Sequence, residues 1–417
     1  MKVIGTFCKV SFIAIWVIMT LSSSSFSTPG HGNNFSVSGT NLIYTPAGNR
    51  IFLKGIGYSP FLPGETPVWG ANLPNDQRYA DHLQIIKGLN CNFVHAFPQF
   101  MPENFFTALD QTDLFYAQDI YVNGYADDIL DDTFQSDTIT HIKKVIDHTH
   151  ALGRPERLVF FSVGDEINAG TIYRTDTRHP TVRNFNGNYI NLTDRTPSEV
   201  AIAKLIDAAI TYELQTYGVK HLYCHTSWTH IGPVKRPDLE VSEDSIFFPD
   251  FGDIICMNIY TYARGVISSP PGSVTGTTYQ GYLEDLIAIS SKPIIITQVG
   301  LSTSPIVPNP GIPEFGGNDY QKVASVYAQV WRDVRTAKGS RTINGLAWFE
   351  FMDEWWKTGD VDDELSHEDN DPEEWFGIYE LQADKKSLSP KGGIPKTVQR
   401  LFANNIISPI FPLLQAD

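Results

Sequence analysis

Residues 294–303, IIITQVGLST, decide the fold of this chain. Three isoleucines and a threonine lead directly into Gln298, Val299 and Gly300. A short apolar run of this kind is typical of a strand buried on both faces of a parallel sheet. The strand ends on one polar side chain, and that side chain is an uncharged amide. Gln298 is therefore either a functional position that lacks a carboxylate or an ordinary interior residue.

Seven similar apolar runs occur along the chain, and helical spacing separates them. In one intervening segment, Val323, Tyr327, Val330 and Val334 recur at intervals of three or four residues. Apolar strands joined by helices predict a parallel sheet covered on both faces. Eight repeats favour an α/β fold closed as a (β/α)₈ TIM barrel over an open sheet. The predicted strands are 51–58, 92–97, 119–122, 158–163, 221–226, 254–260, 293–297 and 346–351.

Two segments before the first predicted barrel strand have features of their own. Residues 1–27 combine Lys2 and Lys9, the apolar run 10–21 and small residues, which predicts a signal peptide and a secreted or periplasmic protein. An uncleaved membrane anchor is the alternative, but the apolar run is short for one. Alternating residues around the turn PAGN predict a short β-hairpin before the first barrel strand. We expect residues 28–417 to form a single domain without stable membrane association.

Composition excludes several classes of function. The net charge of −16, without a basic block, argues against nucleic-acid binding. The sequence has no glycine-rich phosphate loop, so we expect no nucleotide cofactor. Cys91, Cys224 and Cys256 are interpreted as buried thiols rather than a disulfide framework, with a Cys224–Cys256 bridge as the alternative.

Two segments combine carboxylates with aromatic residues. Residues 160–168, FFSVGDEIN, place Asp165 and Glu166 at the end of the fourth predicted strand. Burial would raise the pKa of such a glutamate and suit it to general acid catalysis, whereas helix capping or an arginine pair is the structural alternative. Residues 345–357, GLAWFEFMDEWWK, contain Trp348, Glu350, Trp355 and Trp356 and could stack on and bond sugars, or simply fill the barrel rim.

Two long stretches and one histidine pair contain further polar residues. Residues 169–197 and 360–374 follow the fourth and eighth strands, and we interpret them as loops that line a substrate site. The acidic second stretch lacks the glycine of an EF-hand, because Leu365 stands there, so a solvated loop is favoured over calcium binding. His225 and His230 flank Trp228, but no third ligand has a recognisable spacing. We therefore expect no metal site and assign Trp228 to substrate contact.

Six segments in this order resemble the retaining glycoside hydrolases of clan A, over residues 35–405. These segments are FLKGIGYSP, LNCNFVHAF, FFSVGDEIN, KPIIITQVGLST, FEFMDEWWK and DPEEWFGIYEL. That family consists of (β/α)₈ enzymes acting on β-linked glycans and includes β-glucanases and β-glucanosyltransferases. The resemblance implies a glycoside hydrolase-like protein that hydrolyses or transfers β-linked oligo- or polysaccharides without a cofactor.

The resemblance also implies roles for individual residues. Glu166 matches the general acid/base, Gln298 occupies the nucleophile position, and Tyr260 matches a tyrosine that contacts the nucleophile. The eighth strand, with Trp348, Glu350, Trp355 and Trp356, matches the sugar platform. Asp165, Tyr260, Gln298, Glu350 and Trp355 should line one cleft, with His95 beneath them. Three positions depart from the family: His95 replaces an arginine, Asp165 replaces an asparagine, and Gln298 replaces the nucleophilic glutamate.

An amide cannot form the glycosyl ester of the retaining mechanism, so several interpretations remain open. The chain could be a carbohydrate-binding pseudoenzyme. It could use Asp165 and Glu166 as substrate-assisted hexosaminidases do, with the sugar's 2-acetamido group as nucleophile. It could invert, with Glu350 or Asp127 activating water. An engineered Glu→Gln exchange is a further interpretation, against which the departures at His95 and Asp165 argue.

Overall fold

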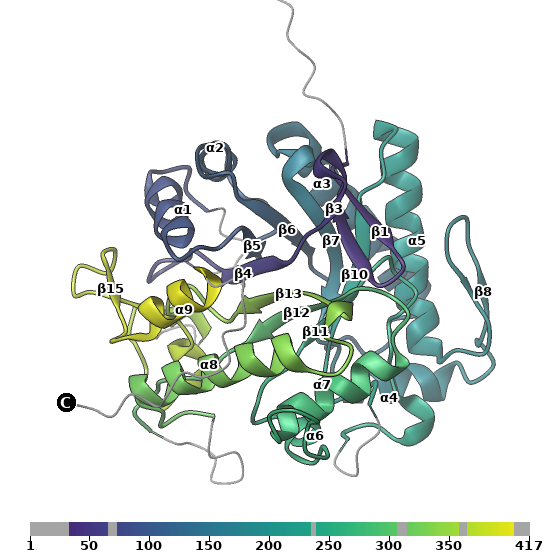
Figure 1. The fold of residues 1–417 in the computed structure, drawn as a ribbon. Coiled ribbons are helices and arrows are strands. Elements are labelled where there is room, and N and C mark those ends of the chain that lie inside the picture. The colour runs from purple at the N-terminus through teal and green to yellow at the C-terminus, as the bar shows by residue number, and fades with distance from the viewer. Residues whose placement is uncertain (1–32, 66–72, 235–238, 307–314, 358–364, 404–417) are drawn as a thin grey trace, which may run out of the picture.

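A closed barrel of eight parallel strands forms the centre of the protein (Figure 1). The computed structural model describes residues 33–65, 73–234, 239–306, 315–357 and 365–403. The strands follow one another around the barrel in chain order, which confirms the predicted TIM barrel. They are β4 Leu53–Tyr58, β5 Phe93–Ala96, β6 Phe115–Ile120, β7 Leu158–Asp165, β10 Leu222–Trp228, β11 Ile255–Asn258, β12 Ile294–Val299 and β13 Ile343–Trp348.

Helices pack around this barrel and cover the outer face of its strands (Figure 1). In α8, Val323, Tyr327, Val330 and Val334 are all buried, as their spacing predicts. The helix α5 begins with a reciprocal capping box between Thr196 and Glu199. The helices are α1 Arg78–Gly88, α2 Glu103–Thr112, α3 Asp132–Leu152, α4 Ala169–Arg178, α5 Pro197–Tyr217, α6 Arg264–Ile267, α7 Thr278–Ile289, α8 Tyr320–Thr336 and α9 Ile394–Ala403.

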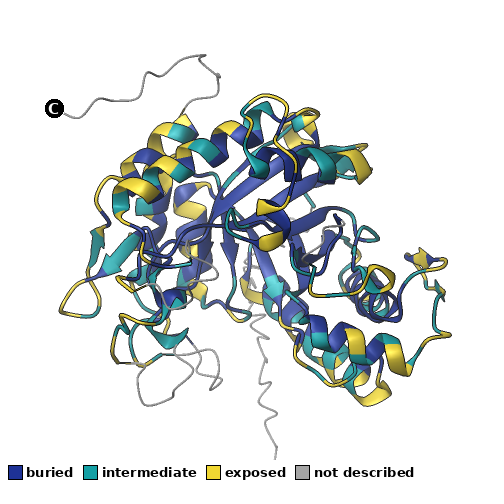
Figure 2. Ribbon diagram, turned by 90° about the horizontal axis from the view of Figure 1, so that it is seen from below, coloured by how far each residue is buried: buried dark blue, intermediate teal, exposed yellow. Residues whose placement is uncertain are grey.

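A small antiparallel sheet closes the N-terminal end of the barrel. It consists of β1 Phe35–Ser38, β2 Asn41–Tyr44 and β3 Asn49–Arg50, so the predicted hairpin is present with an additional strand. Phe35 and Leu42 belong to the same buried cluster as the barrel-interior residues Leu53, Phe93 and Phe160. Figure 2 shows burial over the whole fold: the barrel strands are buried, and the helices around them are more exposed.

Several predicted boundaries and segments differ from the structure. The strand β6 begins before the predicted run 119–122, and β13 begins before 346–351. Residues 169–197 are not an irregular loop: they form α4 and the hairpin of β8 Phe185–Asn186 and β9 Asn191–Leu192. Cys224 and Cys256 are buried thiols whose Sγ atoms lie 3.1 Å apart, without a disulfide.

Two predicted segments fall wholly or partly outside the described residues. The predicted signal peptide, residues 1–27, lies outside them, as does part of the acidic stretch 360–374. Within the rest of that stretch, the short helix η6 Pro372–Trp375 precedes the ribbon of β14 Tyr379–Leu381 and β15 Leu388–Pro390. None of the helices in the described part of the chain is long and apolar enough to cross a membrane.

Candidate active site

The backbone at the end of β7 directs two adjacent carboxyl groups into the mouth of the barrel. In a regular strand, neighbouring side chains point to opposite faces of the sheet. Here Gly164 and Glu166 have positive φ angles of 81° and 46°, which interrupt the alternation. The backbone N–H of Glu166 then bonds the carbonyl of Thr226 on β10 at 3.1 Å. Asp165 and Glu166 can therefore both reach the same partner, Asn258.

The amide of Asn258, the last residue of β11, holds the two carboxyl groups together. Its Nδ2 donates to Asp165 Oδ1 at 3.0 Å and to Glu166 Oε1 at 2.8 Å. The hydroxyl of Thr297 donates to Asn258 Oδ1 at 2.7 Å and so fixes the orientation of this amide. Sequence analysis missed both Asn258 and Thr297. The only signal available was their position as polar residues at the ends of otherwise apolar strands.

Gln298 lies against the same carboxyl pair. Its Nε2 donates to Asp165 Oδ2 at 2.9 Å, and its Oε1 accepts a hydrogen bond from the Tyr260 hydroxyl at 2.7 Å. The side chain is thus held at both of its polar atoms and is 8% exposed. The predicted neighbours Asp165, Glu166, Tyr260 and Gln298 are all brought together. Gln298 acts in this structure as a bridge between the tyrosine and the aspartate.

Burial raises the pKa of both carboxyl groups. It raises the pKa of Glu166 to about 7, although the Asn258 hydrogen bond acts in the opposite direction. Burial also raises the pKa of Asp165 well above its usual range, and the charges of Glu166 and Asp119 add to the effect. Both residues are nevertheless partly exposed to solvent, as groups that receive a ligand must be.

His95 and Lys357 are two further residues near Asp165 and Glu166. The ring of His95 is fully buried, and its Nε2 contacts Asp119 Oδ1 at 2.7 Å. Lys357 lies over the ring of Phe349 at 4.6 Å from its centroid and forms an ion pair with Glu354 at 2.8 Å. The charge of Lys357 lowers the pKa of Glu166 and of Asp165. His95 was predicted beneath the site, whereas Lys357 was not assigned a role.

Comparison with known proteins addresses the fold. The sequence matches no protein-family model and no curated protein. A glycoside hydrolase family 2 β-galacturonidase from Eisenbergiella tayi, bound to galacturonate, superposes with a TM-score of 0.57 at 12% identity. Gas2p from Saccharomyces cerevisiae, in complex with laminaripentaose, gives 0.52 at 12% identity. This chain has the barrel fold of glycoside hydrolases.

The superposition covers nearly all of this chain but only part of its structural neighbours. The alignment covers 89% of this chain and 54% of the β-galacturonidase, and 91% of this chain and 71% of Gas2p. A β-glucuronidase from Ruminococcus gnavus, in complex with a uronic isofagomine, has a TM-score of 0.54 at 13% identity, with 88% and 52% covered. The chain therefore spans about half the length of the two bacterial enzymes.

The tryptophans predicted to form an aromatic platform on the eighth strand pack against other aromatic rings. Trp348 is fully buried and stacks on Tyr327 of α8 at 4.1 Å between ring centroids, and its assignment to sugar contact stays a prediction. Trp355, in the short helix η5 Trp355–Lys357, stacks on the ring of His367 at 5.1 Å. Trp356 packs edge-on against Phe61. All three rings pack against another aromatic ring, whereas their indole N–H groups have no hydrogen-bond partner among the described residues.

The other predicted residues lie in different settings. Glu350 is buried, and both its burial and the charge of Glu354 raise its pKa well above the usual range. Trp228 donates its indole N–H to the carbonyl of Ile167 at 3.0 Å, which ties it to the backbone beside Glu166. Asp127 is 71% exposed and pairs with arginines of α4, so it is poorly placed to activate water at the buried pair.

The candidate metal ligands are used in hydrogen bonds. His225 Nδ1 lies 2.7 Å from the carbonyl of Val163, to which it can donate. Among the described residues, the grouping compatible with a metal ion is His150, Glu213 and His221, which lies between α3, α5 and β10. Glu213 Oε1 accepts hydrogen bonds from both of these histidines, at 2.9 and 2.5 Å. The group is a structural network within the core.

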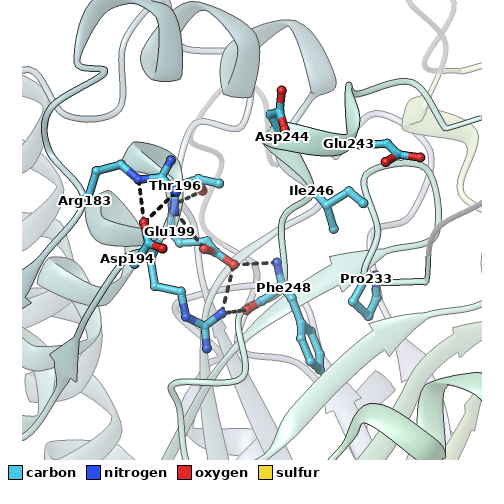
Figure 3. Close-up of a pocket in the computed structure, with 10 residues that line it drawn as sticks. Arg183, Asp194, Thr196, Glu199, Pro233, Glu243, Asp244, Ile246 and Phe248 are labelled. Atoms are coloured by element: carbon cyan, nitrogen blue, oxygen red, sulfur yellow. Dashed lines mark hydrogen bonds and ion pairs between the residues drawn. The ribbon is translucent and has the colours of Figure 1, made fainter.

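A cavity of about 560 Å³ lies apart from the carboxyl pair, beside the N-terminus of α5 (Figure 3). Its charged lining is paired internally: Arg183 bonds Asp194, and Glu199 accepts from Arg195 and from the backbone of Phe248. Asp165, Glu166 and Gln298 are not among its lining residues. The candidate active site therefore rests on the arrangement of side chains at the strand ends rather than on this cavity.

Proposed function

We propose that this protein acts on the glycosidic bond of a β-linked glycan, with Glu166 as the proton donor. One observation carries the proposal: the carboxyl group of Glu166, whose pKa burial raises to about 7, is positioned at the mouth of a glycoside hydrolase barrel. A group with this pKa can protonate the leaving oxygen near neutral pH and afterwards take a proton from water. The fold similarity to carbohydrate-active enzymes is consistent with this role.

The second functional group in this proposal is Asp165. Gln298 cannot form a glycosyl ester, so the retaining mechanism with a nucleophile on β12 is excluded. Asp165 and Glu166 bond one nitrogen at 3.0 and 2.8 Å. Their bonded oxygens are therefore closer than the roughly 6.5–9.5 Å of an inverting pair. The substrate-assisted mechanism requires neither a nucleophile on β12 nor a widely separated pair of carboxyl groups.

The contact between Asp165 and Gln298 favours a substrate that carries a 2-acetamido group. Asp165 Oδ2 accepts an amide N–H from Gln298. The N–H of an acetamido sugar is the same kind of donor and could replace it there. The acetamido oxygen would then attack the anomeric carbon, Asp165 would hold the acetamido nitrogen, and Glu166 would give its proton to the departing oxygen.

The test compares two defined glycans. Wild-type protein is incubated with chitopentaose and with laminaripentaose, and new reducing ends are measured together with the product lengths. We expect cleavage of chitopentaose, a loss of about 100-fold or more in Glu166→Gln, and a comparable loss in Asp165→Asn. The exposed Asp127→Asn is the matched control and should retain activity. Absence of product from both glycans would overturn the proposal of catalysis.

A second candidate function is glycan binding without turnover, and the amide at position 298 favours it. In that case calorimetry would detect binding of a glycan that the wild-type protein leaves intact. Glu166→Gln would then bind as tightly as wild type, since no proton transfer is involved. Binding together with product formation would instead assign the protein to the glycoside hydrolases by activity.

A further inference from the structure

Two tyrosines are unusually exposed in the loop that follows β6. The side chains of Tyr121 and Tyr125 are 58% and 77% exposed, whereas most large apolar side chains of the described chain are buried. The two tyrosines lie four positions apart in one loop that follows the end of β6. Exposed aromatic rings commonly mark a binding surface.

The loop that carries these tyrosines lies directly against Glu166. The backbone N–H of Asn168 donates to the carbonyl of Gly124 at 3.0 Å. A Cβ atom at Gly124 would lie 3.0 Å from the carbonyl oxygen of Glu166, so any larger residue would require the neighbouring backbone to shift by a few tenths of an ångström. Tyr125 follows Gly124 in the chain. The loop segment that carries Tyr125 therefore contacts the backbone of the proposed proton donor.

Hydrogen bonds hold the loop in place on both sides. The backbone N–H of Tyr121 donates to Gln99 Oε1 at 2.9 Å, and that of Tyr125 donates to Asn123 Oδ1 at 3.1 Å. From α4, Arg174 donates to the carbonyl of Ala126 at 3.0 Å. A loop anchored in this way presents its side chains without a large ordering cost on binding.

We propose that Tyr121 and Tyr125 form the platform on which a pyranose ring of the glycan stacks, next to the bond held at Glu166. The apolar face of a sugar ring packs on an aromatic face, and the tyrosine hydroxyls can bond its hydroxyl groups. Compared with the tryptophans of residues 345–357, Tyr121 and Tyr125 are the more exposed, because Trp348 is buried and the rings of Trp355 and Trp356 pack on His367 and Phe61. The inference rests on the proposed function.

The experiment measures binding separately from turnover. Glu166→Gln protein serves as the parent, and calorimetry with chitopentaose and laminaripentaose gives its dissociation constants. Replacing both tyrosines by alanine should weaken binding about 10-fold or more, whereas replacing both by phenylalanine should keep most of the affinity, because the rings remain. Tyr189→Ala, in the hairpin that projects beyond α5 (Figure 1), is the control and should leave binding unchanged.

The outcomes separate the platform from the proposed function. If the alanine double variant binds as tightly as its parent, the platform is wrong and the proposed function stands. If the parent binds neither glycan and wild-type protein releases no product, the proposed function fails and the platform fails with it. Thermal unfolding of each variant checks folding, and exposed positions of this kind should change stability by only about 0.5 kcal/mol.

Discussion

At the scale of single residues, the carboxyl and amide groups at positions 165 and 298 have changed places relative to the pattern that the family resemblance implies. The family resemblance implies an asparagine at position 165 and a glutamate at position 298. This chain has Asp165 and Gln298, and the amide of Gln298 donates to the carboxylate of Asp165 at 2.9 Å. Each residue is therefore complementary to the other. Restoring a carboxylate at 298 would place it beside Asp165.

This contact makes the effect of Gln298→Glu depend on position 165. We expect Gln298→Glu alone to be destabilised by about 1–3 kcal/mol at pH 8, because two carboxylates then face each other. The loss should be smaller at pH 5, where the pair can share a proton. Adding Asp165→Asn should recover the stability. Urea unfolding of the three variants at both pH values measures this, and an additive double variant would contradict it.

Glu166 should make the stability of the protein depend on pH near neutrality. Its pKa is about 7 in the folded protein, against the ordinary value of 4.5 expected in the unfolded chain, so the folded state binds more protons between these values. The contribution of Glu166 to stability should therefore fall as pH rises from about 4.5 through 7. Glu166→Gln should remove this contribution to the decline and be the more stable protein at pH 8, by about 1–3 kcal/mol given its partial exposure. Thermal unfolding between pH 4.5 and 8 tests the sign.

At the scale of elements, one buried glutamate joins two helices to the barrel. Glu213 of α5 accepts hydrogen bonds from His150 of α3, from the ring and backbone of His221, and from the Tyr223 hydroxyl of β10. Burial alone would raise its pKa, but the hydrogen bonds from His150 and His221 lower it to about 2. The carboxylate therefore stabilises the packing of α3 and α5 on β10.

Removing this carboxylate should weaken the protein most at neutral pH. We expect Glu213→Gln to lose about 3–5 kcal/mol at pH 7, because buried donors lose a charged partner. The contribution of Glu213 to stability is complete above about pH 4.5 and is lost as the pH falls toward 2. The free energy of unfolding of the variant should therefore change less than that of wild type between these pH values. Glu103→Gln, an exposed residue of α2, is the control. Equal losses at pH 3 and pH 7 would argue against the assignment.

The sequence predicts some elements of this fold better than others. The strand β12 is recognisable because it begins with three consecutive isoleucines, whereas Gln118 in β6 and Asn344 in β13 interrupt the apolar runs and obscure where these strands begin. The helix α4 was missed because Arg174, Asp176 and their neighbours give it a polar sequence. Asn258 was missed because its partners lie 92 and 93 residues away in the chain, and no local pattern records that contact.

At the scale of the whole molecule, the N-terminal sheet supplies the floor of the barrel. Phe35 packs edge-on against Phe115 of β6 at 5.0 Å between ring centroids and is almost fully buried. Leu42 reaches the same cluster. A segment that precedes the first barrel strand thus completes the packing of strands from around the whole barrel.

Loss of this packing should affect the molecule globally. Phe35→Ala should lower the free energy of unfolding by about 3–5 kcal/mol, through lost burial and a cavity beneath the barrel. Ser38→Ala, in the same strand but exposed, should change it by no more than about 0.5 kcal/mol. Urea unfolding followed by fluorescence compares them. Similar unfolding midpoints for both variants would show that the sheet is not part of the cooperative core.

The amide of Asn258 has a spectroscopic consequence. Its two Nδ2 protons are bonded to different carboxyl groups, one to Asp165 and the other to Glu166. In a nitrogen-15 labelled sample, the two proton resonances of this one nitrogen would therefore follow the ionisation of each acid separately. The side chain of Asn258 is therefore an internal reporter for the order in which the two adjacent acids lose their protons.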